Sequence, residues 1–142
     1  MDTKSYQLVR ETWAQVLPIA DQAAELFYGR LFELSPEIEG LFAGSDMAAQ
    51  RGKLLTALNL AVQNVDNTDA LVPVLQDLGR KHVDYGVKDE HYGTVGAALI
   101  WTLEKGLGEA FTDDARTAWT AVYGLVATTM QDAANERIAA AA

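Results

Sequence analysis

The sequence has no cysteine, only three prolines and only two histidines, and each scarcity narrows what the protein can do. Without cysteine there can be no disulfide, no thiol nucleophile and no Cys-ligated zinc. An excess of basic residues is also missing, because 11 Lys and Arg stand against 20 Asp and Glu, for a net charge of −9. Such a surface repels phosphate, so we expect no nucleic-acid partner and no attraction to an anionic membrane.

Long apolar runs are absent as well. No segment approaches the ~18 consecutive apolar residues of a membrane-spanning helix, and the N-terminus, MDTKSYQLVRETW, lacks a signal-peptide core. We therefore expect no membrane span and a cytoplasmic location. The composition, 49% hydrophobic and 22% charged, suits one globular domain over residues 1–142, with a core at about 5–138 and a frayed alanine-rich tail at 139–142.

The apolar residues that are present recur at helical spacing along nearly the whole chain. On one stretch, positions i, i+4, i+7, i+8 and i+11 are Leu54, Leu58, Ala61, Val62 and Val65. Strand-like alternation and the Asn-Gly or Asp-Gly dipeptides of hairpins are not found. We predict an all-α fold of six to eight helices, at about 4–17, 19–34, 36–42, 46–65, 71–85, 90–107 and 113–138. We assign the three tryptophans either to the core or to helix packing: Trp13, Trp101 and Trp119.

Helix ends are marked by short polar motifs. Ser35 followed by Pro36 predicts an N-cap with proline at the first helical position. Thr112 precedes two aspartates and predicts the start of the last helix, where acidic side chains meet the positive end of the helix dipole. Pro73 follows a loop rich in Asn and Asp, at 64–69, and we expect it at the start of the next helix.

The two histidines are the candidate ligands. Leu71, Leu75, Leu78 and His82 fall at i, i+4, i+7 and i+11, which places His82 on the inward stripe of its helix. Its Nδ1–H can donate to the carbonyl of Leu78, leaving Nε2 with a lone pair facing the interior. A metal ligand and a core histidine bonded to another side chain both remain open. A lone His is a poor zinc site, but haem needs only one axial histidine in an apolar slot. We expect His91 to satisfy the start of its own helix.

Aromatic and polar residues on other helices can form the opposite wall of such a slot. Gln50 and Leu54 lie one turn apart and share a helix face. A buried hydroxyl and a buried amide need partners, so Tyr28 and Gln50 either satisfy each other and the backbone or face a ligand. Aromatic and aliphatic bulk on one helix comes from Phe27, Tyr28, Leu31 and Phe32.

Four segments resemble the bacterial single-domain globins and the haem domain of flavohaemoglobins, in order and spacing, over about residues 5–130. They are FYGRLFELSPEIEGLF (27–42), QRGKLLTALNLAVQNVDN (50–67), LGRKHVDYGV (78–87) and HYGTVGAALI (91–100). The resemblance implies a globin fold around a haem b, iron protoporphyrin IX, that binds O2, NO and CO. It also implies that His82 is the proximal iron ligand and that Tyr28 and Gln50 stabilise the bound gas. The expected haem contacts are Phe42, Lys53 near a propionate, Leu54, Leu78, His82, Val87, Tyr92 and Val95.

The sequence departs from the family pattern in three ways. Gly93 stands where the family has proline after the Tyr92 position. Ala134 stands where flavohaemoglobin-like proteins carry the glutamate of a proximal His–Tyr–Glu set, so we do not expect the full set here. No reductase segment follows the globin-like part, so we expect an external reductase of flavin or ferredoxin type.

These features favour reversible dioxygen binding, for storage, delivery or scavenging, by a monomer or weak homodimer. The alternative is a nitric oxide dioxygenase that works with a separate reductase, with nitrite reduction as a lesser variant. A third possibility differs in kind: a haem-free helical interaction module, which would be colourless when purified.

Overall fold

The computed structural model describes residues 2–141, which are helical except for short connections, and confirms the predicted all-α fold. Seven α-helices and two short 3-10 helices follow one another close to the predicted positions. They are α1 Thr3–Val16, η1 Leu17–Ile19, α2 Ala20–Leu34, α3 Pro36–Leu41, α4 Met47–Gln63, α5 Thr68–Asp84, α6 His91–Leu107, η2 Gly108–Ala110 and α7 Asp113–Ala141.

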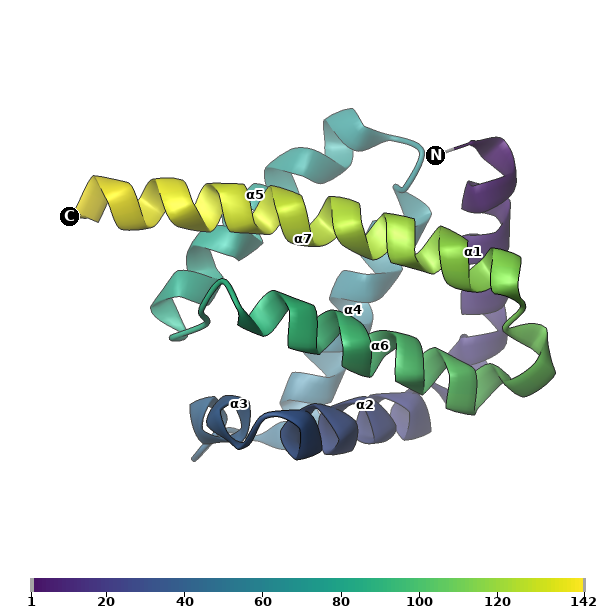
Figure 1. The fold of residues 1–142 in the computed structure, drawn as a ribbon, viewed down its shortest axis with the longest axis horizontal. Helices are drawn as coiled ribbons and strands as arrows, with labels where there is room; N and C mark the ends of the chain where they lie inside the picture. Colours follow the sequence, from purple (N-terminus) through teal and green to yellow (C-terminus); the bar gives the residue numbers. More distant parts are fainter. Residues whose placement is uncertain (1, 142) are drawn as a thin grey trace.

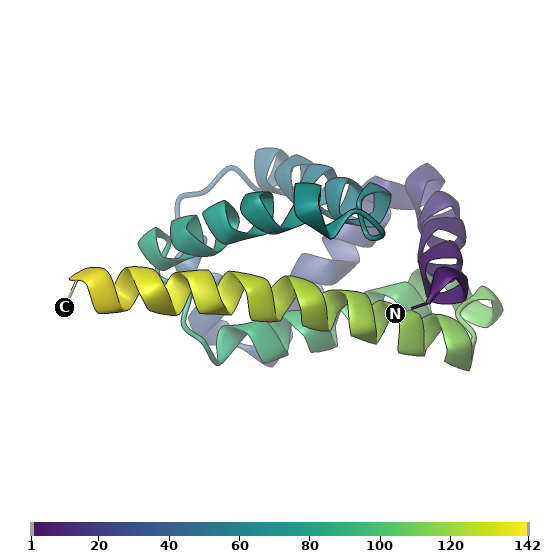
Figure 2. The same ribbon diagram turned by 90° about the horizontal axis from the view of Figure 1, so that it is seen from above.

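Helices α6 and α7 run beside each other across the fold, with α2 below α6 and α4 crossing behind them (Figure 1). Viewed from above, α5 lies along the other face of α7, and these two helices make the most extensive helix pair in the fold (Figure 2). The last turns of α7 extend past its neighbours, and residues 139–141 continue this helix. Ala142 lies outside the described residues. No helix in the described range is long and apolar enough to cross a bilayer.

Two tryptophans form the centre of the core between α1 and α7. Trp13 and Trp119 are 2% and 1% exposed, and their ring centroids lie 6.2 Å apart. Their indole nitrogens are both satisfied, because Trp119 Nε1 donates to Thr12 Oγ1 at 2.7 Å and Trp13 Nε1 donates to Asn59 Oδ1 at 2.9 Å. Trp101 lies outside the core: it is half-buried on α6, with its ring under the Arg30 guanidinium of α2.

The predicted caps are confirmed. Ser35 Oγ accepts from the Ile38 N–H at 3.3 Å, and Thr112 Oγ1 accepts from the Ala115 N–H at 3.1 Å. Pro73 is the exception, because α5 begins at Thr68 and the proline lies inside the helix. Proline in this place removes one backbone hydrogen bond, and burial of the leucines on either side of it, Leu71 and Leu75, offsets the loss.

A glycine sets the distance between α5 and α7. A Cβ on Gly79 would lie 2.3 Å from the Met130 carbonyl oxygen and 2.8 Å from the Met130 Cα, so only glycine lets the two backbones meet. Because Gly79 lies one turn before His82, this contact also sets where the candidate ligand sits.

Candidate metal centre

His82 lies in the last turns of α5 and makes the hydrogen bond that its spacing predicts. Its Nδ1 donates to the Leu78 carbonyl at 2.6 Å, which leaves the lone pair on Nε2. Among the described residues, no protein atom hydrogen-bonds to Nε2. Burial lowers the pKa of His82 from its ordinary 6.5, against the opposing effect of the Leu78 bond. The imidazole is therefore neutral at pH 7, as a metal ligand must be.

Tyr92 contributes a second free polar atom beside this histidine. Its ring centroid lies 6.5 Å from that of His82, and the residue is 7% exposed. Within residues 2–141 its buried hydroxyl finds no hydrogen-bond partner. Burial raises the pKa of Tyr92, and the Asp89 charge adds to the rise, so the hydroxyl stays protonated. A buried unpaired hydroxyl is rare in proteins and points to a group that the chain itself does not supply.

Tyr28 lies in an aromatic wall on α2 and α3. It is 6% exposed, and its ring centroid is 5.1 Å from that of Phe27, 5.9 Å from Phe32 and 5.5 Å from Phe42. Burial raises the pKa of Tyr28, while the nearby Gln50 side chain acts in the opposite direction. The structure therefore brings Tyr28, Gln50 and Phe42 together, with the phenol held as a neutral donor.

The other predicted haem contacts divide between two apolar clusters. Leu54 and Val95 pack against the cluster that contains Tyr28 and Phe42. Leu78 and Val87 pack against a second cluster that contains Tyr92. Lys53 is exposed on α4.

His91 differs from His82 because both of its ring nitrogens have partners. Its Nδ1 accepts from the Lys88 backbone N–H at 2.9 Å, so Nε2 carries the proton and donates to Glu37 Oε2 at 3.2 Å. Ligand atoms of Glu37, Glu90 and His91 lie within 4.8 Å of one another, but no lone pair remains on the imidazole for a cation. His91 thus bonds the connection before its helix and the α3 carboxylate, rather than a free N–H of the first turn of α6. The bond from His91 to Glu37 was not predicted, because the two residues are 54 positions apart and local spacing does not relate them.

Sequence reasoning also missed Tyr123. Its hydroxyl donates to the Tyr92 carbonyl at 2.5 Å, and its ring lies on Gly96, where a Cβ would come within 2.7 Å of Tyr123 Cε2. Burial raises the pKa of Tyr123, so this donor stays protonated. Tyr123 thus links α7 to the first turn of α6, which contains Tyr92.

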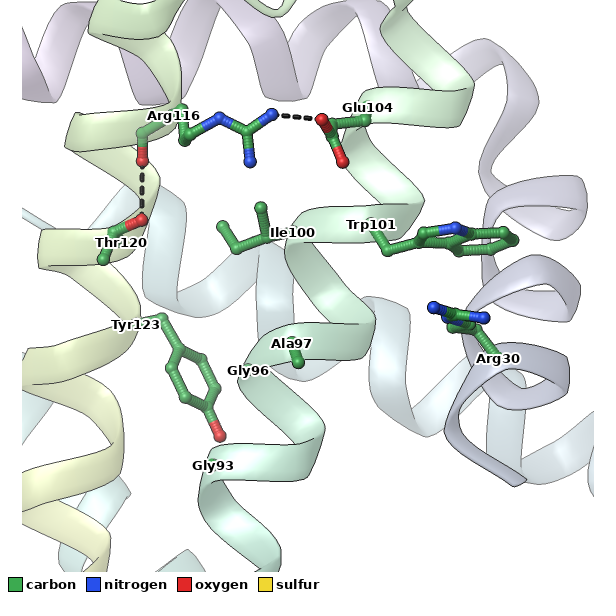
Figure 3. Close-up of a pocket in the computed structure, with 10 residues that line it drawn as sticks. All are labelled: Arg30, Gly93, Gly96, Ala97, Ile100, Trp101, Glu104, Arg116, Thr120 and Tyr123. Atoms are coloured by element: carbon green, nitrogen blue, oxygen red, sulfur yellow. Dashed lines mark hydrogen bonds and ion pairs between the residues drawn. The ribbon is translucent and has the colours of Figure 1, made fainter. Parts of the chain in front are cut away.

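A surface groove of about 570 Å³ lies along α6, between α2 and α7 (Figure 3). The Arg30 guanidinium lies 5.2 Å from the Trp101 ring centroid, and Arg116 pairs with Glu104 across the groove. None of the residues predicted to contact a haem lines this groove, but Tyr123, which donates to the Tyr92 carbonyl, does.

The fold is that of the globins. It matches the crystal structure of a hexacoordinated haem protein from an anhydrobiotic tardigrade with a TM-score of 0.87 and 17% identity, over 95% of this chain and 96% of that one. It matches a bacterial globin from Campylobacter jejuni with a TM-score of 0.82 and 24% identity, over 95% and 97% of the two chains. The globin family model matches residues 25–130, and the chain belongs to this family.

Sequence relatives include flavohemoproteins. The chain is 32% identical over 133 residues to that of Bacillus subtilis and 39% identical over 106 residues to that of Chromobacterium violaceum. These alignments cover 89% and 73% of the chain but only 32% and 26% of the relatives, so the chain spans about a third of their length or less. The neuroglobin of Tetraodon nigroviridis is 29% identical over 143 residues, or 92% of this chain and 90% of that protein. As a globin, the chain has a haem cofactor and binds diatomic gases on it.

Proposed function

We propose that this globin binds dioxygen reversibly on a haem b whose iron is held by His82. The observation that carries the proposal is the state of the His82 imidazole: Nδ1 is committed to the Leu78 carbonyl, and Nε2 has no partner in the described residues. The haem supplies the iron to which the gas binds. Haem b is favoured over a covalently attached haem, because the chain has no cysteine to form thioether links.

Two apolar clusters, one with Tyr28 and one with Tyr92, supply the residues proposed to hold the flat apolar haem. Phe42 and Leu54 belong to the cluster on the Tyr28 side, and Leu78 and Val87 to the cluster on the His82 side. Val95 lies on α6 and packs with the first of these. The unpaired Tyr92 hydroxyl supports a group that is supplied from outside the chain. Lys53 is exposed, so its ammonium is available to a propionate at the pocket rim.

Tyr28 and Gln50 are the donors proposed to face the gas. The phenol is buried and neutral, and the Gln50 amide lies against it. A hydrogen bond to a charged acceptor stabilises it by roughly 1.5–3 kcal/mol. Two such donors in an apolar wall predict slow dioxygen release and high affinity.

Nitric oxide dioxygenation is the second candidate, favoured by the Tyr28–Gln50 pair together with the similarity to flavohemoproteins. In this reaction nitric oxide and dioxygen combine to give nitrate, with one electron supplied by an external reductase of flavin or ferredoxin type. Ala134 is buried at the position where flavohaemoglobin-like proteins carry a glutamate, so the proximal side lacks an acidic partner there. Sustained conversion of nitric oxide to nitrate with an added reductase would favour this function over simple binding.

One set of absorption spectra tests the first proposal. We expect ferric, ferrous and CO-bound protein to show a haem b with one histidine ligand and a site open to CO. Failure of the recombinant protein to take up haem, or a ferrous spectrum closed to CO, would contradict it. Sedimentation of the same sample distinguishes a monomer from a weak homodimer.

A further inference from the structure

Helix α3 contacts the connection between α5 and α6 at two points that lie one helical turn apart. Glu37 and Leu41 occupy positions i and i+4 of this part of the chain and so share a face. Leu41 Cδ2 lies 3.3 Å from where a Cβ on Gly86 would be. Glu37 binds Lys88 and His91. One face of α3 therefore contacts the connection at Gly86 and again at Lys88 and His91.

The second contact is a closed polar ring of three residues. Lys88 Nζ donates to Glu37 Oε1 at 2.5 Å, His91 Nε2 donates to Glu37 Oε2 at 3.2 Å, and the Lys88 backbone N–H donates to His91 Nδ1 at 2.9 Å. The side chain of His91 is 4% exposed and that of Glu37 is 52% exposed. Without the carboxylate, the Nε2–H of a buried imidazole loses the acceptor it has here, which is costly. Glu37 thus supports the ring from the surface.

The connection that α3 contacts is also hydrogen-bonded to the end of α5. The Val87 N–H donates to the carbonyl of His82 at 3.0 Å, and the Gly86 N–H donates to the Val83 carbonyl at 3.0 Å. Gly86 has φ +89°, a conformation suited to glycine that turns the chain out of the helix. Displacement of Lys88 therefore moves Val87 and, through its hydrogen bond, the backbone of His82.

We propose that Glu37, acting through His91 and Lys88, is a positioning residue for His82. By holding the connection that ends α5, the α3 contact sets the orientation of the His82 imidazole and slows loss of the haem. The inference rests on the proposed role of His82 as iron ligand. Glu37 itself touches neither His82 nor the iron, and its effect is transmitted through the backbone of residues 86–88.

The test compares Glu37→Ala with Glu39→Ala in the haem-loaded protein. Glu39 is an exposed glutamate on the same short helix, with no side-chain hydrogen bond in the described structure, so it is a matched control. We expect Glu37→Ala to shift the iron–histidine stretching band of the ferrous protein and to speed haem transfer to excess apomyoglobin by about tenfold. Glu39→Ala should do neither.

Two further variants separate positioning from a general loss of stability. Glu37→Gln keeps an amide oxygen that can accept from His91 Nε2, so we expect it to restore most of the wild-type band position. Lys88→Met removes only the exposed ion pair and should give a smaller shift than Glu37→Ala; it also serves if Glu37→Ala does not fold. An unshifted band and an unchanged rate of haem loss in Glu37→Ala overturn the proposal, even if the melting temperature falls.

A haem-free measurement keeps this proposal distinct from the proposed function. Hydrogen exchange of the Lys88 amide, which donates to His91, should be slow in the wild-type apoprotein and faster in Glu37→Ala but not in Glu39→Ala. A wild-type spectrum without ligation by His82 overturns the proposed function and this proposal together. A normal wild-type spectrum with no difference between the two alanine variants overturns this proposal alone.

Discussion

The ends of two neighbouring helices each carry a histidine, half-buried His82 and buried His91, and the two differ in which ring nitrogens remain without a partner. At the end of α5, His82 uses Nδ1 for the Leu78 carbonyl, and no described residue hydrogen-bonds to Nε2. At the start of α6, His91 uses both nitrogens, for the Lys88 N–H and the Glu37 carboxylate. Inward orientation alone therefore does not define a metal ligand. The number of ring nitrogens that the protein satisfies is what separates the two.

The two histidines also differ in how they are held. His82 takes its place from the packing of α5 on α7, where Gly79 lies against the Met130 backbone, and its one hydrogen bond is within its own helix. His91 is held by side-chain and backbone groups from outside its helix. Mutations near His82 should therefore act through packing and ligation, and mutations near His91 through loss of polar bonds.

Replacing each histidine in turn is the strongest test of this comparison. His82→Ala should lower haem affinity by more than about 100-fold, since loss of even an outer-shell partner of a metal ligand costs 10–100-fold. Added imidazole should restore the spectrum by filling the place of the side chain. His91→Gln should keep the histidine-ligated spectrum. Retention of that spectrum by His82→Ala, or its loss in His91→Gln, would reverse the assignment.

The packing that places His82 can be tested with glycines. Gly79→Ala should lower the free energy of unfolding by about 1–3 kcal/mol, because the new Cβ meets the Met130 backbone rather than a movable side chain. Gly124→Ala is the matched change on α7, where nothing lies within 4 Å of the new Cβ, and should raise stability by up to about 1 kcal/mol. Chemical denaturation measures both. Equal effects of the two changes would show that α5 does not need the close approach.

Two tyrosines near the site differ in the same way as the two histidines. Tyr123 donates its hydroxyl to the Tyr92 carbonyl, whereas the Tyr28 phenol lies with Gln50 in the aromatic wall. Tyr28→Phe should speed dioxygen dissociation by about tenfold, equivalent to about 1.4 kcal/mol. Tyr6→Phe on α1 is the control and should leave the rate unchanged in stopped-flow measurement. No change in Tyr28→Phe would remove Tyr28 from this role.

The smallest expected effect is the pH dependence of the Glu37 contact. The Lys88 bond, followed by the His91 bond, holds the pKa of the Glu37 carboxyl below its ordinary 4.5. A carboxyl with a lowered pKa in the folded state stabilises the protein above pH 4.5, and this contribution disappears as the pH falls through the lowered value. The stability difference between wild type and Glu37→Gln should therefore shrink on acidification. A difference that stays constant from pH 6 to the acid transition would show that the ionised carboxylate contributes nothing.

The helices and the main candidate ligand were predictable because they depend on residues within one turn of each other. Apolar spacing placed the helices, Ser35 and Thr112 marked two of their starts, and the four-residue step from Leu78 to His82 predicted the bond at 2.6 Å. Pro73 misled the boundary of α5, since burial of the neighbouring leucines outweighs the local cost of a proline.

The rest depends on residues far apart in the chain. The Glu37–His91 bond joins residues 54 positions apart, and the Tyr123–Tyr92 bond joins residues 31 positions apart. Trp101 is a large apolar side chain on a helix, like the core tryptophans, yet it is half-buried beside Arg30. Spacing says which face of a helix is apolar, but it does not say which neighbour that face meets.

The sequence by itself determined the all-α class, the helix order and an inward histidine whose Nδ1 bonds one turn back, because hydrophobic periodicity and capping are local. Only the tertiary structure decided which buried groups keep a free polar atom. That outcome depends on which helices approach closely enough to donate or accept: Glu37 reaches His91, whereas no described group reaches the Tyr92 hydroxyl or hydrogen-bonds to Nε2 of His82.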